Sequence, residues 1–198
     1  YFYVKEFVMP FIRVAGDMTI ALNSGSVNTA AEIEFPKLQE IGGTLTLGTN
    51  RNANNITFPL LKKILGSCSV TTYKLKNDIE FTNLESIGTD GADAQIKFEI
   101  EATNILCPKL KTINGKFDIA TSSFMFDMEV DKVSYPNVES ISENLSITCP
   151  YSDFGSNGIL SIDFSGLKSV KGISISGQGD VSDFSSFKYL FENNVLTG

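Results

Sequence analysis

Hydrophobic residues recur along the chain in a short pattern that is copied several times. In one clear copy, Ile33 and Phe35 alternate with polar residues, and Leu38 and Ile41 follow at steps of three. Alternation with a period of two is typical of a β-strand, whereas steps of three suit a tight corner. Each copy therefore predicts a strand that ends in a corner. The aromatic position of the pattern, held once by a thiol, falls at Phe35, Phe58, Phe81, Cys107, Tyr135 and Phe164, which are 23, 23, 26, 28 and 29 residues apart.

A second alternating pair follows each corner. Leu45 and Leu47 lie four and six residues beyond Ile41, and this spacing predicts a second strand after a bend that contains glycine. Equivalent pairs are Cys68 and Val70, Phe117 and Ile119, Leu145 and Ile147, and, one residue early, Ile173 and Ile175. In one copy we expect the insertion TDGADAQ to place the pair at Phe98 and Ile100. An N-terminal copy keeps the same offsets at Phe11, Val14, Met18 and Ile20.

These units predict an all-β fold. A single coil cannot bury its own apolar side chains, so the coils must stack and pair like strands in parallel. Proline closes several of the first strands because it has no backbone N–H to donate; it stands at Pro36, Pro59, Pro108 and Pro136. The sequence therefore predicts a right-handed parallel β-helix, or β-solenoid, with about seven coils of about 23–29 residues.

We expect one solenoid domain over residues 1–198, with a cap or partial coil at 1–13, repeat coils at 14–175 and a C-terminal cap at 176–198. Terminal coils need such covers because exposed strand edges invite association. In the last segment, spacings of three and four predict a short amphipathic helix. Its apolar residues are Phe184, Phe187, Leu190 and Phe191.

Composition excludes several classes of function. The net charge of −7 disfavours nucleic acid as a partner, because phosphates attract basic surfaces, and no apolar run is long enough to span a membrane. The chain has no histidine, which removes Ser-His and Cys-His catalysis and the commonest metal ligand. We therefore predict no enzyme activity, no cofactor and no metal site. A carboxylate pair that hydrolyses a polysaccharide stays open as an alternative.

The three cysteines do not indicate a scaffold built from disulfides. Cys68 and Cys107 occupy core positions of the pattern, so we expect both to pack as small hydrophobic side chains. The pairing of Cys149 is left open by the sequence.

Outward positions of the second strands form the first candidate binding surface. They are mostly serine and threonine, with a charged middle, and such a face suits hydrogen bonding to a glycan or a protein strand; a plain solvated sheet has the same composition. We expect Glu99 to lie beside Asp118 and to repel it by about 1 kcal/mol in water, unless a lysine or a cation offsets the charge. The candidate residues are Lys97, Glu99, Glu101, Lys116 and Asp118.

The second candidate site lies in the returns between coils, whose length varies. Repeat proteins commonly place recognition loops at such an edge. In one loop three carboxylates alternate with apolar residues, and calcium, a basic partner or an exposed acidic strand all fit this pattern, although the spacing differs from an EF-hand loop. The candidate residues are Asp127, Glu129, Asp131, Tyr151 and Phe154.

The consensus F/Y-P-x-L-x-x-I-x-G-x-L-x-I, seen in FPKLQEIGGTLTL, resembles the receptor L domain over roughly residues 8–175. That domain is a leucine-rich-repeat-like, right-handed β-helix in the extracellular parts of the insulin and epidermal growth factor receptors. The chain is also similar to fungal GPI-anchored cell-wall proteins and to bacterial surface proteins. The resemblance implies leucine-rich-repeat-like coils and non-catalytic recognition or adhesion outside the cell, without naming a ligand. The Cys-rich flanks of the receptors are missing here, which favours a microbial surface protein.

The sequence thus predicts function only by class. We expect a cell-surface or secreted module, its targeting signal removed ahead of Tyr1, that binds a protein or a glycan. The alternatives are a polysaccharide-active enzyme with a carboxylate pair and a purely structural spacer. The oligomeric state stays open.

Overall fold

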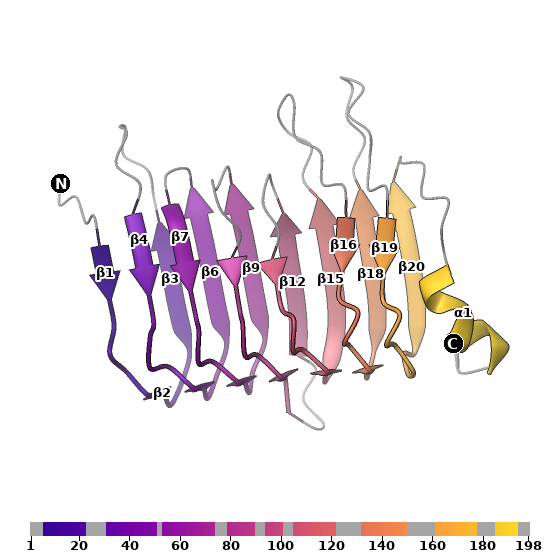
Figure 1. Cartoon of the computed structure of the whole chain (residues 1–198), viewed down its shortest axis with the longest axis horizontal. Helices are drawn as coiled ribbons and strands as arrows, with labels where there is room; N and C mark the ends of the chain where they lie inside the picture. Colours follow the sequence, from indigo (N-terminus) through magenta and orange to yellow (C-terminus); the bar gives the residue numbers. More distant parts are fainter. Residues whose placement is uncertain are drawn as a thin grey trace, which may run out of the picture.

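The computed structural model describes residues 6–22, 31–50, 53–73, 79–89, 94–100, 105–121, 132–149, 161–177 and 185–193. Within them the chain winds as a stack of coils built from parallel strands, with one short helix at the C-terminal end. Figure 1 shows the chain descending along the nearer strands and ascending along the more distant ones while it advances along the stack, which is a right-handed winding. The prediction of a right-handed parallel β-solenoid is confirmed.

The strands that precede each corner form one wall of the stack, and this wall is interrupted. Its first part is a five-stranded sheet of β1 (Glu6–Val8), β4 (Ala31–Glu34), β7 (Ala53–Thr57), β10 (Ile79–Glu80) and β13 (Ile105–Leu106). Its second part is a separate sheet of β16 (Lys132–Ser134) and β19 (Ser161–Asp163). The break therefore falls between β13 and β16.

The opposite wall continues through the stack, and the corner sheet continues as far as β17 (Ser140–Ile141), after which an isolated bridge joins Ser140 to Ser169. The corner sheet consists of β2 (Arg13–Val14), β5 (Glu40–Ile41), β8 (Lys63–Ile64), β11 (Ser86–Ile87), β14 (Thr112–Ile113) and β17 (Ser140–Ile141). The opposite wall is a seven-stranded sheet of β3 (Met18–Leu22), β6 (Leu45–Asn50), β9 (Cys68–Tyr73), β12 (Ala94–Ile100), β15 (Gly115–Thr121), β18 (Asn144–Cys149) and β20 (Gly172–Gly177). A 3₁₀ turn, η1 (Ser185–Phe187), and α1 (Lys188–Glu192) follow.

The register of the strands confirms most of the repeat alignment. Ile33, Ile56 and Ile79 are direct partners in neighbouring strands. In the incomplete N-terminal copy, Met18 pairs with Leu45 as the offsets predict. The same residue of each copy therefore stands above its equivalent in the next coil.

The alignment is wrong in the coil that carries the insertion. Ile96 pairs with Cys68, and Phe98 pairs with Val70, so the residues in register with the pair of the preceding coil lie two positions before the expected Phe98 and Ile100. The segment Ile-Lys-Phe-Glu-Ile alternates throughout its length. Its hydrophobic pattern therefore fits two registers that differ by two residues, because both put the same side chains on the inner face.

Aromatic rings form a stacked column in the first half of the core. Phe35, Phe58 and Phe81 are fully buried, and both neighbouring pairs of ring centroids lie 4.9 Å apart with nearly parallel planes. This distance matches the spacing of hydrogen-bonded strands, so each ring packs on the ring of the next coil without displacing the backbone.

The column changes where Cys107 takes the aromatic position. In the same coil Phe117 occupies the inward position of the opposite wall, so a large side chain there fills the space that the small thiol leaves. The Phe117 ring packs edge-on against Tyr135, with centroids 5.2 Å apart. Burial raises the pKa of Cys68 to about 12 and raises that of Cys107 as well. Both thiols are buried and free, which confirms their prediction as core residues.

Charges alternate in sign along the corner of the stack. At one position of this corner, the charged residue of each coil donates its backbone N–H to the carbonyl of its equivalent in the preceding coil. The lysine of one coil therefore stands next to the glutamate of the preceding coil, as in the contact of 3.0 Å between Lys168 Nζ and Glu139 Oε2. Single exposed pairs stabilise little, but the alternation avoids like charges in adjacent coils. The series is Lys62, Glu85, Lys111, Glu139 and Lys168.

Titration of Glu139 tests this arrangement. The hydrogen bond and charge of Lys168, assisted by the charge of Lys111, lower the pKa of Glu139 below its ordinary value of 4.5. A lowered carboxyl pKa adds stability above the ordinary pKa, and this contribution is lost as the pH falls through the folded-state pKa. We expect carboxyl-detected NMR to show the shift, and Lys168→Met to return the pKa of Glu139 toward 4.5. An unchanged midpoint in that variant would contradict the pairing.

The C-terminal cap is a single turn of 3₁₀ helix followed by α1. Phe187 and Leu190 are buried, and the Phe187 ring stacks on Phe164 of the last coil with centroids 6.0 Å apart. The prediction of a short helix is thus confirmed. The expected burial of Phe191 on the apolar face of this helix is wrong, because the side chain is 61% exposed. Phe184 lies outside the described residues.

Candidate functional site

The outward face of the seven-stranded sheet carries a row of small polar residues. Thr46, Ser69, Asp118, Ser146 and Ser174 stand at equivalent positions of their strands and are exposed or partly exposed. This agrees with the expected hydroxyl-rich face. A flat row of hydroxyl groups hydrogen-bonds water as readily as a ligand, so the row by itself selects no partner.

The charged middle of this face differs from the prediction. The backbone register places Lys97 between Ser69 and Asp118. Glu99 is instead the partner of Ala120 on one side and Thr71 on the other. The predicted repulsion between Glu99 and Asp118 is therefore wrong, because it depended on the register that was two residues too far along.

The remaining candidates of this surface are only partly described. Lys116 is exposed and pairs in register with Gln95 of β12. The side chains of Lys97 and Glu99 and the whole of Glu101 lie outside the described residues. So do all five loop candidates, whose predicted role stays a prediction: Asp127, Glu129, Asp131, Tyr151 and Phe154. In the described part of the chain, no group of three or more acidic or cysteine side chains is placed to hold a metal ion.

The break in the first wall interrupts a regular series of hydrogen bonds. Phe81 donates its backbone N–H to the carbonyl of Leu106 at 2.9 Å, and Tyr135 makes the same bond to the coil that follows it. The bond that would continue the series, from the N–H of Cys107 to the carbonyl of Ser134, is not formed. Two strand edges therefore face each other across the break without pairing.

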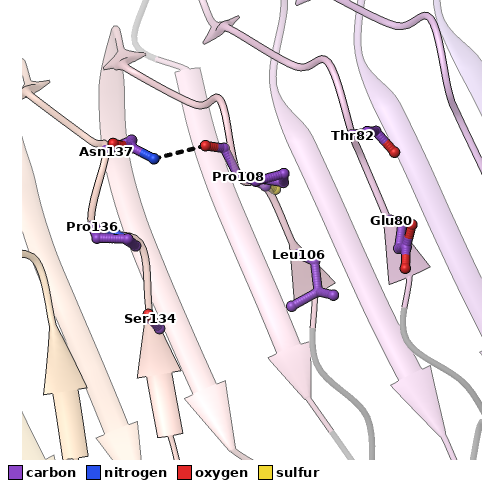
Figure 2. Close-up of a pocket in the computed structure, with 8 residues that line it drawn as sticks. Glu80, Thr82, Leu106, Pro108, Ser134, Pro136 and Asn137 are labelled. Atoms are coloured by element: carbon purple, nitrogen blue, oxygen red, sulfur yellow. Dashed lines mark hydrogen bonds between the residues drawn. The ribbon is translucent and has the colours of Figure 1, made fainter.

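A groove of about 500 Å³ occupies this break (Figure 2). Its lining comes from three neighbouring coils: the segment of Glu80 and Thr82, the segment that ends in Pro108, and the segment that holds Ser134, Pro136 and Asn137. The lining combines apolar and small polar side chains. The residues are Glu80, Thr82, Leu106, Cys107, Pro108, Ser134, Pro136 and Asn137.

Two side-chain hydrogen bonds hold the coils together across the groove. The buried Tyr135 hydroxyl donates to the carbonyl of Ile105 at 3.1 Å, and Asn137 Nδ2 donates to the carbonyl of Pro108 at 2.8 Å (Figure 2). Burial raises the pKa of Tyr135 well above its ordinary value, with smaller contributions from the neighbouring Cys107 and Cys68. The phenol therefore stays protonated and remains a donor at neutral pH.

Removal of the Tyr135 hydroxyl tests its role at the break. Tyr135→Phe keeps the ring but leaves the carbonyl of Ile105 without this buried donor, which costs about 2 kcal/mol of unfolding free energy. Urea denaturation checks this value. Phe164→Tyr is the reverse substitution, because it adds a hydroxyl group at the buried aromatic position of the next coil. A Tyr135→Phe variant as stable as the parent would show that the hydroxyl does not support the break.

The groove was not foreseen from the sequence, although a signal for it exists. The aromatic position passes from phenylalanine to Cys107 and then to Tyr135, the two coils between which the wall opens. The repeat pattern predicts these residues as equivalent members of one column. A small thiol followed by a phenol with a polar tip is a change in both volume and hydrogen bonding, and it marks the irregular coil boundary.

Comparison of the chain with protein-family models, with curated proteins and with solved structures finds no match. Among the described residues, no helix has the length and apolar character needed to cross a membrane. The function of the chain is therefore inferred from its own sequence and geometry.

Proposed function

We propose that the chain is a non-catalytic recognition module, secreted or displayed at the cell surface, that binds a protein or a glycan. The observation that carries this proposal is the groove at the break between β13 and β16, where unpaired strand edges meet an otherwise regular wall. The resemblance of the repeat to receptor L domains and to microbial surface proteins supports the compartment. The polar row on the seven-stranded sheet adds a second surface that accepts hydrogen bonds.

The chemistry of the core favours binding over catalysis. The chain has no histidine to act as a general base, and the thiols of Cys68 and Cys107 are buried with raised pKa values. A thiol with a pKa of about 12, as at Cys68, has almost no thiolate at neutral pH and is a poor nucleophile. The described residues thus offer surfaces rather than an activated reactive group.

A glycan array, combined with a peptide array and an assay for released reducing sugar, tests the proposal. Retention of a ligand without turnover is the expected result. Turnover of a polysaccharide that is lost in Glu99→Gln or Asp118→Asn would replace recognition by carboxylate-dependent hydrolysis. Retention of nothing on either array would leave the role of a structural spacer.

A further inference from the structure

We propose that the groove between β13 and β16 binds an extended, basic peptide segment of a partner protein. The inference rests on the proposed recognition function and names the ligand of its described groove. Three features of the groove carry it: two open backbone edges, an apolar lining and the carboxylate of Glu80.

The backbone edges fit an extended polypeptide. The N–H of Cys107 and the carbonyl of Ser134 are the donor and acceptor that would continue the series of the paired coils, but they do not bond. A buried backbone group without a partner is costly, and an extended peptide supplies both a carbonyl and an N–H. Recognition by addition of a peptide backbone to an open strand edge is a common mode of peptide binding.

The lining fits the side chains of such a peptide. Leu106 is 37% exposed and lies beside Pro108, with Pro136 on the opposite wall. Every second side chain of an extended peptide points to the same face. Alternate apolar side chains therefore reach this lining while the others point toward the polar rim.

The charges beside the groove favour a basic ligand. Glu80 lines the groove, is the direct neighbour of Leu106 in the sheet and makes no ion pair with a described residue. Glu34 lies two coils before Glu80 in the same row. Lys109, which follows Pro108 in the sequence, donates its ammonium group to the side-chain oxygen of Asn83.

The same features disfavour a glycan in this groove. No aromatic face is among the lining residues, and the ring of Tyr135 is buried in the core. Sugar binding commonly uses an aromatic ring whose apolar face packs on the sugar. Acidic sugars would in addition meet the carboxylate of Glu80.

Binding of a synthetic peptide of alternating lysine and valine, blocked at both ends, tests the charge requirement. We expect saturable binding by calorimetry, and no binding when glutamate replaces lysine in the peptide. Glu80→Gln should weaken the affinity about threefold. Glu85→Gln removes the same charge from the corner, away from the groove lining, and should leave the affinity unchanged. Equal weakening in both variants would mean attraction to net charge and would overturn the proposal.

Loss of apolar contact is tested with a second matched pair. Leu106→Gln should weaken peptide binding about fivefold because the groove loses its main exposed apolar side chain. Leu60→Gln changes a similarly exposed leucine, 42% exposed, outside the groove and should bind as the parent does. Unfolding curves of all four variants verify that the fold is retained.

Hydrogen exchange at single amides locates the peptide. The amide of Cys107 should exchange more slowly when the peptide is bound, because its N–H gains a partner, whereas the amide of Phe81, already bonded to Leu106, should not change. Peptide binding without protection at Cys107 would place the ligand elsewhere and overturn the groove proposal. A glycan retained on the array with no peptide bound would overturn it as well, while recognition as the general function would stand.

Discussion

Replacement of Phe58 by alanine is expected to lower the unfolding free energy by about 4 kcal/mol. The ring is fully buried and lies between the rings of Phe35 and Phe81, 4.9 Å from each. Its removal leaves a cavity in the middle of the column and takes away two stacking contacts at once. The parallel strands on both sides fix the spacing of the coils, so the neighbouring rings cannot close the gap.

Urea denaturation followed by circular dichroism measures this loss. Leu60→Ala is the matched control two residues away, because its side chain is 42% exposed at the corner, and it should cost less than about 1 kcal/mol. Similar losses in both variants would show that the column of rings does not dominate the stability of these coils.

Replacement of Gly66 by alanine is expected to cost about 3 kcal/mol, through the close approach of neighbouring coils at the bend. A Cβ atom at this position would lie 2.6 Å from the carbonyl carbon of Gly43 and 2.8 Å from its oxygen. The N–H of Gly66 also donates to that oxygen at 3.0 Å. The backbone of one coil must move to make room, and this hydrogen bond is then distorted.

The control for this change is Gly48→Ala in β6. A Cβ atom there meets nothing within 4 Å, and the partner positions in the neighbouring strands hold Ala21 and Thr71. The variant should match the parent or gain up to about 1 kcal/mol, because alanine restricts the unfolded chain. A thermal melt of both variants distinguishes steric conflict at Gly66 from a general intolerance of the fold to glycine replacement.

The stacking of coils could be predicted because its physical cause repeats. Every coil must present the same apolar positions to its neighbours. The spacing of residues such as Ile33, Ile56 and Ile79 therefore predicts the register from the sequence alone. The glycine of the bend follows the same logic, since each coil passes closely over the one before it. Periodicity therefore predicts what is common to all coils.

What differs between coils was harder to predict. The inserted coil was misaligned because Ile96, Phe98 and Ile100 alternate without a break, and only the hydrogen bonds to β9 select one register. The groove depends on the absence of one backbone hydrogen bond, between Cys107 and Ser134. A hydrophobic pattern does not indicate which backbone groups pair. Lys62, Glu85 and Lys111 can be read from the sequence, but only the stacking of the coils makes their charges neighbours.

The interrupted wall also divides the molecule mechanically. In a linear array each coil is stabilised by its immediate neighbours, and the coils of β13 and β16 share two continuous sheets, whereas each pair of neighbouring coils before them shares three. We therefore expect the array to open more readily at this interface than between the coils that precede it, so that the segments on either side unfold as two foldons. A ligand that bound both edges would connect these foldons. Its binding free energy would then stabilise the array against opening at this interface.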